Sequence, residues 1–171
     1  MGRGTRDRFT RLSERKRAVR AARKLAPRDG NPDELVSNVA AHRGRPIVMM
    51  PMPLPAEAPS GMWVSTETSD YLIYPAETTL TRRTAVICHE VGHMLMGHDP
   101  GLVDESPSSL LSALAPDLMP GHAARVLARH GYNNAQESDA EYLATVLVTL
   151  LARAKHDEGW SRPGSISARL R

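Results

Sequence analysis

Residues 84–98 read TAVICHEVGHMLMGH, an apolar run interrupted by His89, Glu90 and His93. On an α-helix, residues four apart lie on one face with Cβ atoms roughly 5–6 Å apart, so His89 and His93 project together. Two imidazole nitrogens at that spacing suit one zinc ion, and Glu90, one position round the helix, is placed to polarise a water beside it. The alternative is a helix that carries surface histidines, because such a short pattern also arises by chance.

The surroundings of the two histidines favour the metal interpretation. The apolar or small neighbours are Ala85, Val86, Cys88, Val91, Gly92, Leu95 and Met96. A histidine pair in a mainly buried helix needs partners for its ring nitrogens, and a metal ion supplies them. Gly92 costs the helix roughly 1 kcal/mol relative to alanine. Its position between the histidines therefore suggests that another backbone passes close by.

Length and composition predict one domain that does not depend on disulfides. A chain of 171 residues is long enough to bury a core. The single cysteine, Cys88, excludes a disulfide within the chain, fits a reducing compartment, and is interpreted as a small core residue. No run approaches 18 apolar residues, and the charged N-terminus lacks the apolar segment of a secretory signal. The sequence therefore predicts a cytoplasmic protein without a membrane span.

Charge is distributed unevenly along the chain. Residues 1–30 hold eleven Lys and Arg against three Asp and Glu, whereas residues 31–171 hold eleven against sixteen. A basic arm of this kind could touch nucleic acid or an acidic partner. The favoured interpretation is a peripheral helix that docks on the acidic remainder, although the apolar stripe Leu12, Val19 and Leu25 also permits a core role. Direct nucleic-acid binding is not expected, and residues 1–28 are the only candidate region for it.

Apolar spacing, turn residues and caps predict a mostly helical chain with a few short strands. The predicted elements are a helix at 9–26, a helix at 33–44 capped by Asp33 and ended by Gly44, a strand at 46–50, an extended loop at 51–61, a β-hairpin from 62–66 and 71–75, the histidine-bearing helix capped by Thr79 or Thr81, and helices at 121–131 and 134–155. The hairpin is expected to offer an exposed edge to which an extended peptide adds as a strand.

A catalytic zinc site needs a third protein ligand and one open position. His98 is the nearest candidate, but Gly97 and His98 follow His93 by four and five residues, whereas the metzincin pattern requires three and six. His98 is therefore interpreted as a cation that satisfies carbonyl groups at the helix end.

Glu137 is the better candidate for the third ligand. It shares one stripe of the last helix with Ala140, Ala144, Leu147 and Leu151. A carboxylate on a buried stripe is costly unless it meets a charge. Glu141, one turn later, is a candidate acceptor for the second nitrogen of a ligating histidine. Alternatively, Glu137 and Asp139 only complement the dipole at the start of a helix.

In order and in motif, the chain resembles the ImmA/IrrE-type zinc metallopeptidases, particularly short actinobacterial members. The stretches that carry the resemblance are RGRPIVMMPMPLP (43–55), SGMWVSTETSDYLIYPAET (60–78), ICHEVGHMLMGH (87–98) and ESDAEYLATVL (137–147). The resemblance implies an α+β, zincin-like fold, mostly helical, with a small antiparallel sheet or hairpin before the metal helix. It also implies that His89, His93 and Glu137 bind Zn²⁺ and that Glu90 is the general base. The family often has glutamate where this chain has Asp139, which leaves the choice between Glu137 and Asp139 open.

The resulting hypothesis is a zinc metalloprotease that regulates transcription by cleaving a cytoplasmic protein such as a helix-turn-helix repressor. Its expected parts are the basic helical arm (1–30), a zincin-like domain (31–155) and a flexible polar tail (156–171). One alternative is a regulatory or toxin–antitoxin-type binding partner that keeps the metal for stability and cleaves nothing. Another is a nucleic-acid-binding protein led by its basic arm.

Overall fold

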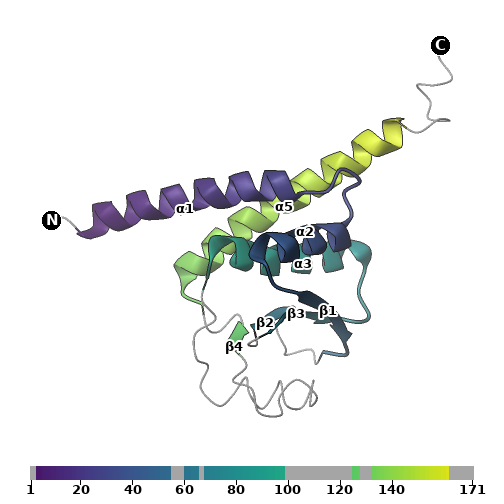
Figure 1. The fold of residues 1–171 in the computed structure, drawn as a ribbon, viewed down its shortest axis with the longest axis horizontal. Helices are drawn as coiled ribbons and strands as arrows, with labels where there is room; N and C mark the ends of the chain where they lie inside the picture. Colours follow the sequence, from purple (N-terminus) through teal and green to yellow (C-terminus); the bar gives the residue numbers. More distant parts are fainter. Residues whose placement is uncertain (1–2, 55–59, 66–67, 99–124, 128–131, 162–171) are drawn as a thin grey trace.

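The computed structural model describes residues 3–54, 60–65, 68–98, 125–127 and 132–161 (Figure 1). Its elements are α1 (Arg3–Leu25), α2 (Pro32–Arg43), β1 (Ile47–Met52), β2 (Met62–Ser65), β3 (Asp70–Pro75), α3 (Leu80–Met96), β4 (Arg125–Leu127) and α5 (Asn134–Ser161). The fold is α+β and mostly helical, which confirms the predicted class. The small sheet is mixed and not purely antiparallel as expected, because β1 pairs parallel with β3. The finer expectation of a zincin-like fold stays a prediction.

The described elements form three layers. Figure 1 shows α1 and α5 on one side, α2 and α3 in the middle, and the sheet on the other side. Helix α3 contacts α5, α1 and α2 as well as strand β3, so it is the central element of the packing. The histidine-bearing segment therefore lies between the outer helices and the sheet, as its apolar character predicts.

Local chemistry fixes where the two middle helices begin and end. Helix α2 begins after Asn31, whose side chain accepts a hydrogen bond from the backbone N–H of Asp33, with Pro32 in the first helical turn. The predicted Asp33 cap was therefore wrong, because proline at the first helical position displaces the cap to the residue before it. Gly44 ends α2 in the left-handed conformation, as predicted. Thr79 caps α3, which decides between the two predicted threonines.

The sheet has the strand order β1-β3-β2-β4. Strands β2 and β3 pair antiparallel, which confirms the predicted hairpin, while β1 pairs parallel with β3. Strand β4 pairs antiparallel with residues 63–65 of β2. Both edges of the hairpin are thus occupied, and the expectation of an exposed hairpin edge was wrong. Residues 125–127 belong to the segment 121–131, for which a helix was predicted. They form a strand instead, because they pair with β2. The rest of that segment lies outside the described residues.

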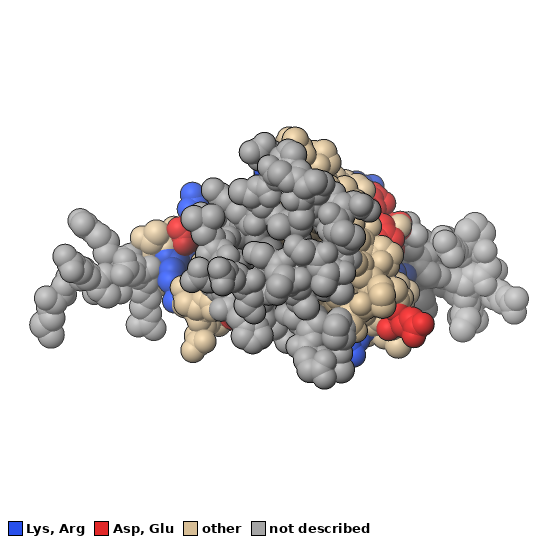
Figure 2. Space-filling model, turned by 90° about the horizontal axis from the view of Figure 1, so that it is seen from below, with Lys and Arg blue, Asp and Glu red and all other residues tan. Residues whose placement is uncertain are grey.

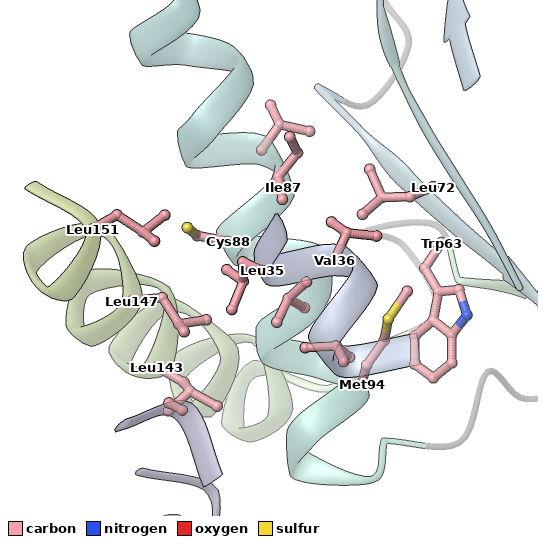
Figure 3. Close-up of a cluster of buried hydrophobic side chains, with 14 of the residues drawn as sticks. Leu35, Val36, Trp63, Leu72, Ile87, Cys88, Met94, Leu143, Leu147 and Leu151 are labelled. Atoms are coloured by element: carbon pink, nitrogen blue, oxygen red, sulfur yellow. The ribbon is translucent and has the colours of Figure 1, made fainter. Parts of the chain in front are cut away.

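Apolar side chains from both helix layers and from the sheet meet in one core. Figure 3 shows Leu143, Leu147 and Leu151 of α5 beside Ile87 and Cys88 of α3, with Leu35 and Val36 of α2 and the sheet residues Trp63 and Leu72 around them. Cys88 is fully buried, and burial raises the pKa of its thiol to about 12. The interpretation of Cys88 as an unreactive core residue agrees with this environment.

A buried carboxylate joins the sheet to the helices. Asp70 at the start of β3 is fully buried and accepts hydrogen bonds from the Arg43 guanidinium, with an Nη2–Oδ2 distance of 2.9 Å. Arg43 also donates to the carbonyl oxygen of Met94, 3.3 Å away, and its guanidinium lies 4.9 Å from the ring centroid of Trp63. One arginine therefore ties α2 to β2, to β3 and to the end of α3.

Helix α1 contributes small residues to the core. Ala18 and Ala22 are buried and belong to the same cluster as the leucines of α5, whereas Leu12 is 49% exposed. The buried face of α1 is therefore its alanine face. Val19 and Leu25 of the predicted stripe are partly buried and pack against the same core, whereas Leu12 does not. The division of the chain at residue 30 stays a prediction, but in the described structure α1 packs into the common core.

Helix α5 is longer than its apolar pattern predicted. It continues to Ser161, so residues 156–161 of the predicted flexible tail are helical, and residues 162–171 lie outside the described part. None of the described helices combines the length and the apolar character needed to cross a membrane.

Deleting residues 1–26 should destabilise the protein, because it removes Ala18 and Ala22 from the core. A loss of about 2 kcal/mol corresponds to a fall in Tm of about 4–8 °C for a chain of this size. The control is deletion of residues 1–9, which leaves the packed half of α1 in place. Equal Tm values for the two deletions, measured by circular dichroism, would show that α1 contributes nothing to the core.

Candidate metal centre

Helix α3 presents its two predicted ligand histidines toward the start of α5. The Nε2 atoms of His89 and His93 lie 3.1 Å apart, and the rings meet edge to face with centroids 4.8 Å apart. The side chain of His93 is 1% exposed and that of His89 is 14% exposed. The pair is therefore largely withdrawn from water.

Glu137 in the first turn of α5 completes a cluster with these histidines. Its Oε2 lies 3.6 Å from Nε2 of His89, and its Oε1 lies 3.9 Å from Nε2 of His93. The possible ligand atoms of all three residues lie within 4.8 Å of one another. His89, His93 and Glu137 could therefore hold a metal ion, and the structure brings together the three residues that the sequence singled out.

The spacing and the chemistry of these atoms fit a small cation with nitrogen and oxygen ligands. Ligands bonded at about 2.0–2.1 Å and tetrahedral angles lie about 3.3 Å from one another, which is close to the separations found here. Burial, together with the neighbouring His89 and His98, lowers the pKa of His93 to about 3. His93 is thus neutral near pH 7, which is the form that binds a metal.

The cluster forms because α3 and α5 approach each other closely. A Cβ atom at Gly92 would lie 2.8 Å from the carbonyl oxygen of Ala140 and 3.4 Å from its Cα. Gly92 is buried between the two histidines, and Ala140 lies one turn after Glu137. The expectation that a backbone passes beside Gly92 is confirmed, and that backbone belongs to the helix that carries Glu137.

Asp139 has different partners from Glu137. Its buried carboxylate pairs with Arg11, at an Nη2–Oδ2 distance of 3.1 Å, and with Nε of Arg15. Geometry therefore favours Glu137 over Asp139 as the third ligand. This pairing was not predicted from the sequence. Its sequence signal is the spacing of Arg11 and Arg15, which places two guanidinium groups on one face of α1.

Glu90 lies on α3 between the two histidines and is 5% exposed. Its Oε1 would be 3.3 Å from a Cβ atom at Gly61, the residue before β2. A side chain at Gly61 would also lie 2.3 Å from Cγ1 of Val86, so glycine is required where the chain passes this part of α3. Glu90 thus extends toward the sheet, whereas the histidines extend toward α5.

His98 is a buried neighbour of His93 and not a cation at the helix end. Its Nδ1 lies 2.9 Å from Nδ1 of His93, and burial lowers its pKa, so it is neutral near pH 7. The last carbonyl groups of α3 instead accept the backbone N–H groups of Gly97 and His98. Tyr132 stacks on the His93 ring, with centroids 3.8 Å apart and planes 21° apart.

The remaining candidates have different surroundings. Glu141 is exposed on α5, so the structure does not bring it to a histidine as an acceptor within the described residues. Of the residues considered for stabilising an oxyanion, Tyr132 lies at the cluster, and Tyr74 is buried with the Arg83 guanidinium 5.1 Å from its ring centroid. Tyr71 is partly buried on β3. His122 and His130 lie outside the described residues.

Comparison with protein-family models, with curated proteins and with solved structures finds no match to this chain. The resemblance described above therefore stays a prediction. The case for a metal centre depends on the geometry of His89, His93 and Glu137.

The purified protein should bind about one equivalent of Zn²⁺, because three ligands converge on one point. His89→Ala and Glu137→Ala should each lose most of this metal after dialysis, since each leaves a site with two ligands. Asp139→Ala should still reach full stoichiometry at saturating zinc, because Asp139 points to α1. Metal analysis by mass spectrometry measures all four proteins, and metal loss in the Asp139 variant with retention in the Glu137 variant would reassign the ligand.

Gly92→Ala should destabilise the protein and weaken zinc binding, although alanine favours a helix over glycine by about 1 kcal/mol. The added methyl group meets the Ala140 carbonyl, and overpacking of this kind typically costs about 1–3 kcal/mol. Thr81→Ala, at an exposed position of the same helix, is the control and should not lower the Tm. Denaturant unfolding and zinc titration measure both effects, and a Gly92→Ala protein as stable as the wild type would contradict the close approach of α3 and α5.

Proposed function

We propose that this protein is a zinc-dependent endopeptidase of the cytoplasm, with the zincin-like fold of the ImmA/IrrE-type metallopeptidases that its sequence resembles. One observation carries the proposal: His89, His93 and Glu137 converge within 4.8 Å, and Glu90 follows directly after the first of them. Two imidazoles and one carboxylate are a ligand set of catalytic zinc sites, in which the fourth position stays open.

Glu90 has the role of general base in this proposal. Zn²⁺, when bound, supplies a Lewis acid and lowers the pKa of a water molecule toward neutrality. The Glu90 carboxylate takes a proton from the attacking water and passes it to the amine that leaves the cleaved peptide bond. Glu90 directly follows His89 on α3 and is 5% exposed, so its carboxylate is shielded from bulk water.

A DNA-binding repressor of the helix-turn-helix class is the proposed substrate. Residues 31–171 hold eleven Lys and Arg against sixteen Asp and Glu, and an acidic surface favours encounter with a basic protein. An extended substrate cannot add to the β2–β3 hairpin, because β1 and β4 occupy its edges. Among the described strands, β1 and β4 are the outer ones, so strand addition would take place at one of these two.

Pairing within the protein weakens the case for a nucleic-acid-binding function. Figure 2 shows the molecule from below, and the blue and red residues visible there are interspersed. Affinity for nucleic acid comes mainly from a concentrated row of cations that contacts phosphates. On α1, Arg11 and Arg15 are paired with Asp139 and are not available for such contacts.

Glu90→Gln should keep its zinc and lose cleavage of the proposed substrate, a helix-turn-helix repressor of the kind that a neighbouring gene would encode, by a factor of at least about 10², the usual contribution of a general base. The measurement is gel electrophoresis of the purified repressor with each variant, together with zinc analysis. Glu141→Gln, which removes an exposed carboxylate from α5, is the control and should cleave normally. A stable complex without cleavage, equal for wild type and Glu90→Gln, would instead support the binding-partner alternative.

A further inference from the structure

Two arginines of α1 contact α5 on both sides of Glu137 along the chain. Nη2 of Arg11 donates to the carbonyl oxygen of Ala135, at 3.1 Å, and to Oδ2 of Asp139, at 3.1 Å. Arg15, one turn later on α1, pairs with the other oxygen of Asp139. Glu137, in the first turn of α5, lies midway along the chain between Ala135 and Asp139. The two guanidinium groups therefore fix the backbone segment that presents Glu137.

His93 also has a partner at its second ring nitrogen. His98 contacts His93 through the two Nδ1 atoms, 2.9 Å apart. His93 therefore faces His89 and Glu137 through Nε2 and His98 through Nδ1. Such contacts orient the ring of a ligating histidine.

The first turn of a helix needs support of this kind. Its N–H groups lack partners within the helix, and the turn frays easily. Before α5, residues 128–131 lie outside the described part, while Asn133 caps the turn by accepting from the N–H groups of Ala135 and Gln136. The cap acts along the helix axis, whereas the two arginines act from the side and bind the turn to α1.

We propose that Arg11 and Arg15 are positioning residues of the metal centre: the arginine clamp, formed by these two residues on Asp139 and Ala135, sets the position of Glu137 relative to His89 and His93. The inference rests on the proposed metal site but does not require peptidase activity. Two of the positive charges of the basic arm would thus serve a contact within the protein and not a contact with a partner. The arm then contributes to metal affinity although Arg11 and Arg15 are not among the candidate ligands.

The direction of the change in zinc affinity distinguishes the proposed clamp from a general effect of charge. Removing two positive charges near a cation site should strengthen cation binding if only long-range charge matters. Loss of the clamp should instead weaken cation binding, because contacts that orient metal ligands typically contribute about 10–100-fold in metal affinity. The control double variant, Arg17→Ala with Arg20→Ala, removes the same charge from exposed positions of the same helix.

The test uses the full-length chain with Zn²⁺ and Co²⁺ as probes. The Arg11→Ala/Arg15→Ala variant should bind Zn²⁺ about 10–100-fold more weakly than the wild type in competition with a chromophoric chelator. Its Co²⁺ complex should show a changed visible absorption band, which a purely structural role elsewhere would not produce. The Arg17/Arg20 control should match the wild type in both measurements.

Further variants make each outcome decisive. A triple variant that combines Arg11→Ala, Arg15→Ala and Asp139→Asn should bind zinc about as weakly as Asp139→Asn alone. The arginines and Asp139 act through the same contact, so their effects should not add. If the double alanine variant does not fold, Arg11→Gln and Arg15→Gln alone should each show part of the loss. Unchanged zinc affinity in a folded clamp variant overturns the inference and leaves the proposed function intact. A wild-type protein that binds no zinc overturns both.

Discussion

Helices α3 and α5 meet where Gly92 faces the backbone of Ala140, and a methyl group at position 92 would lie 2.8 Å from the Ala140 carbonyl oxygen. Only glycine permits this separation without a shift of one helix. The candidate site depends on it, because two ligands come from one helix and the third from the other. Carboxylate and imidazole side chains are short, so a helix displaced by the thickness of a methyl group would separate Glu137 from the histidines.

Polar groups hold this arrangement from two directions. On the sheet side, the buried Asp70 binds Arg43, which also reaches the Met94 carbonyl at the end of α3. On the outer side, Asp139 binds the two arginines of α1. Buried carboxylates are stabilised only when they are paired, and each of these is paired with arginine from a separate helix. The two ion pairs therefore specify how the helices are placed around α3.

Burial separates the chemical roles of the groups around the candidate centre. The low pKa of His93 keeps that ring neutral and ready to bind a metal near pH 7. Cys88, although adjacent to His89, has a raised pKa and faces the apolar core, so its thiol does not compete as a ligand. Glu90 extends from α3 toward Gly61, so it is adjacent to His89 along the chain but is not part of the ligand cluster.

Patterns that lie within one element could be predicted from the sequence alone. The spacing of His89 and His93, the Gly44 stop and the hairpin depend on neighbours a few residues apart, and local geometry determines them. The pairing of β4 with β2, the cap at Asn31, the neutral state of His98 and the arginine clamp were not predicted. All but the Asn31 cap depend on contacts between distant segments, and no period in the sequence encodes which charged residue meets which carboxylate. Glu137 falls between these cases. Its position on the apolar stripe predicted a buried acid. Only the packing of α5 against Gly92 placed Glu137 beside the histidines and Asp139 beside α1.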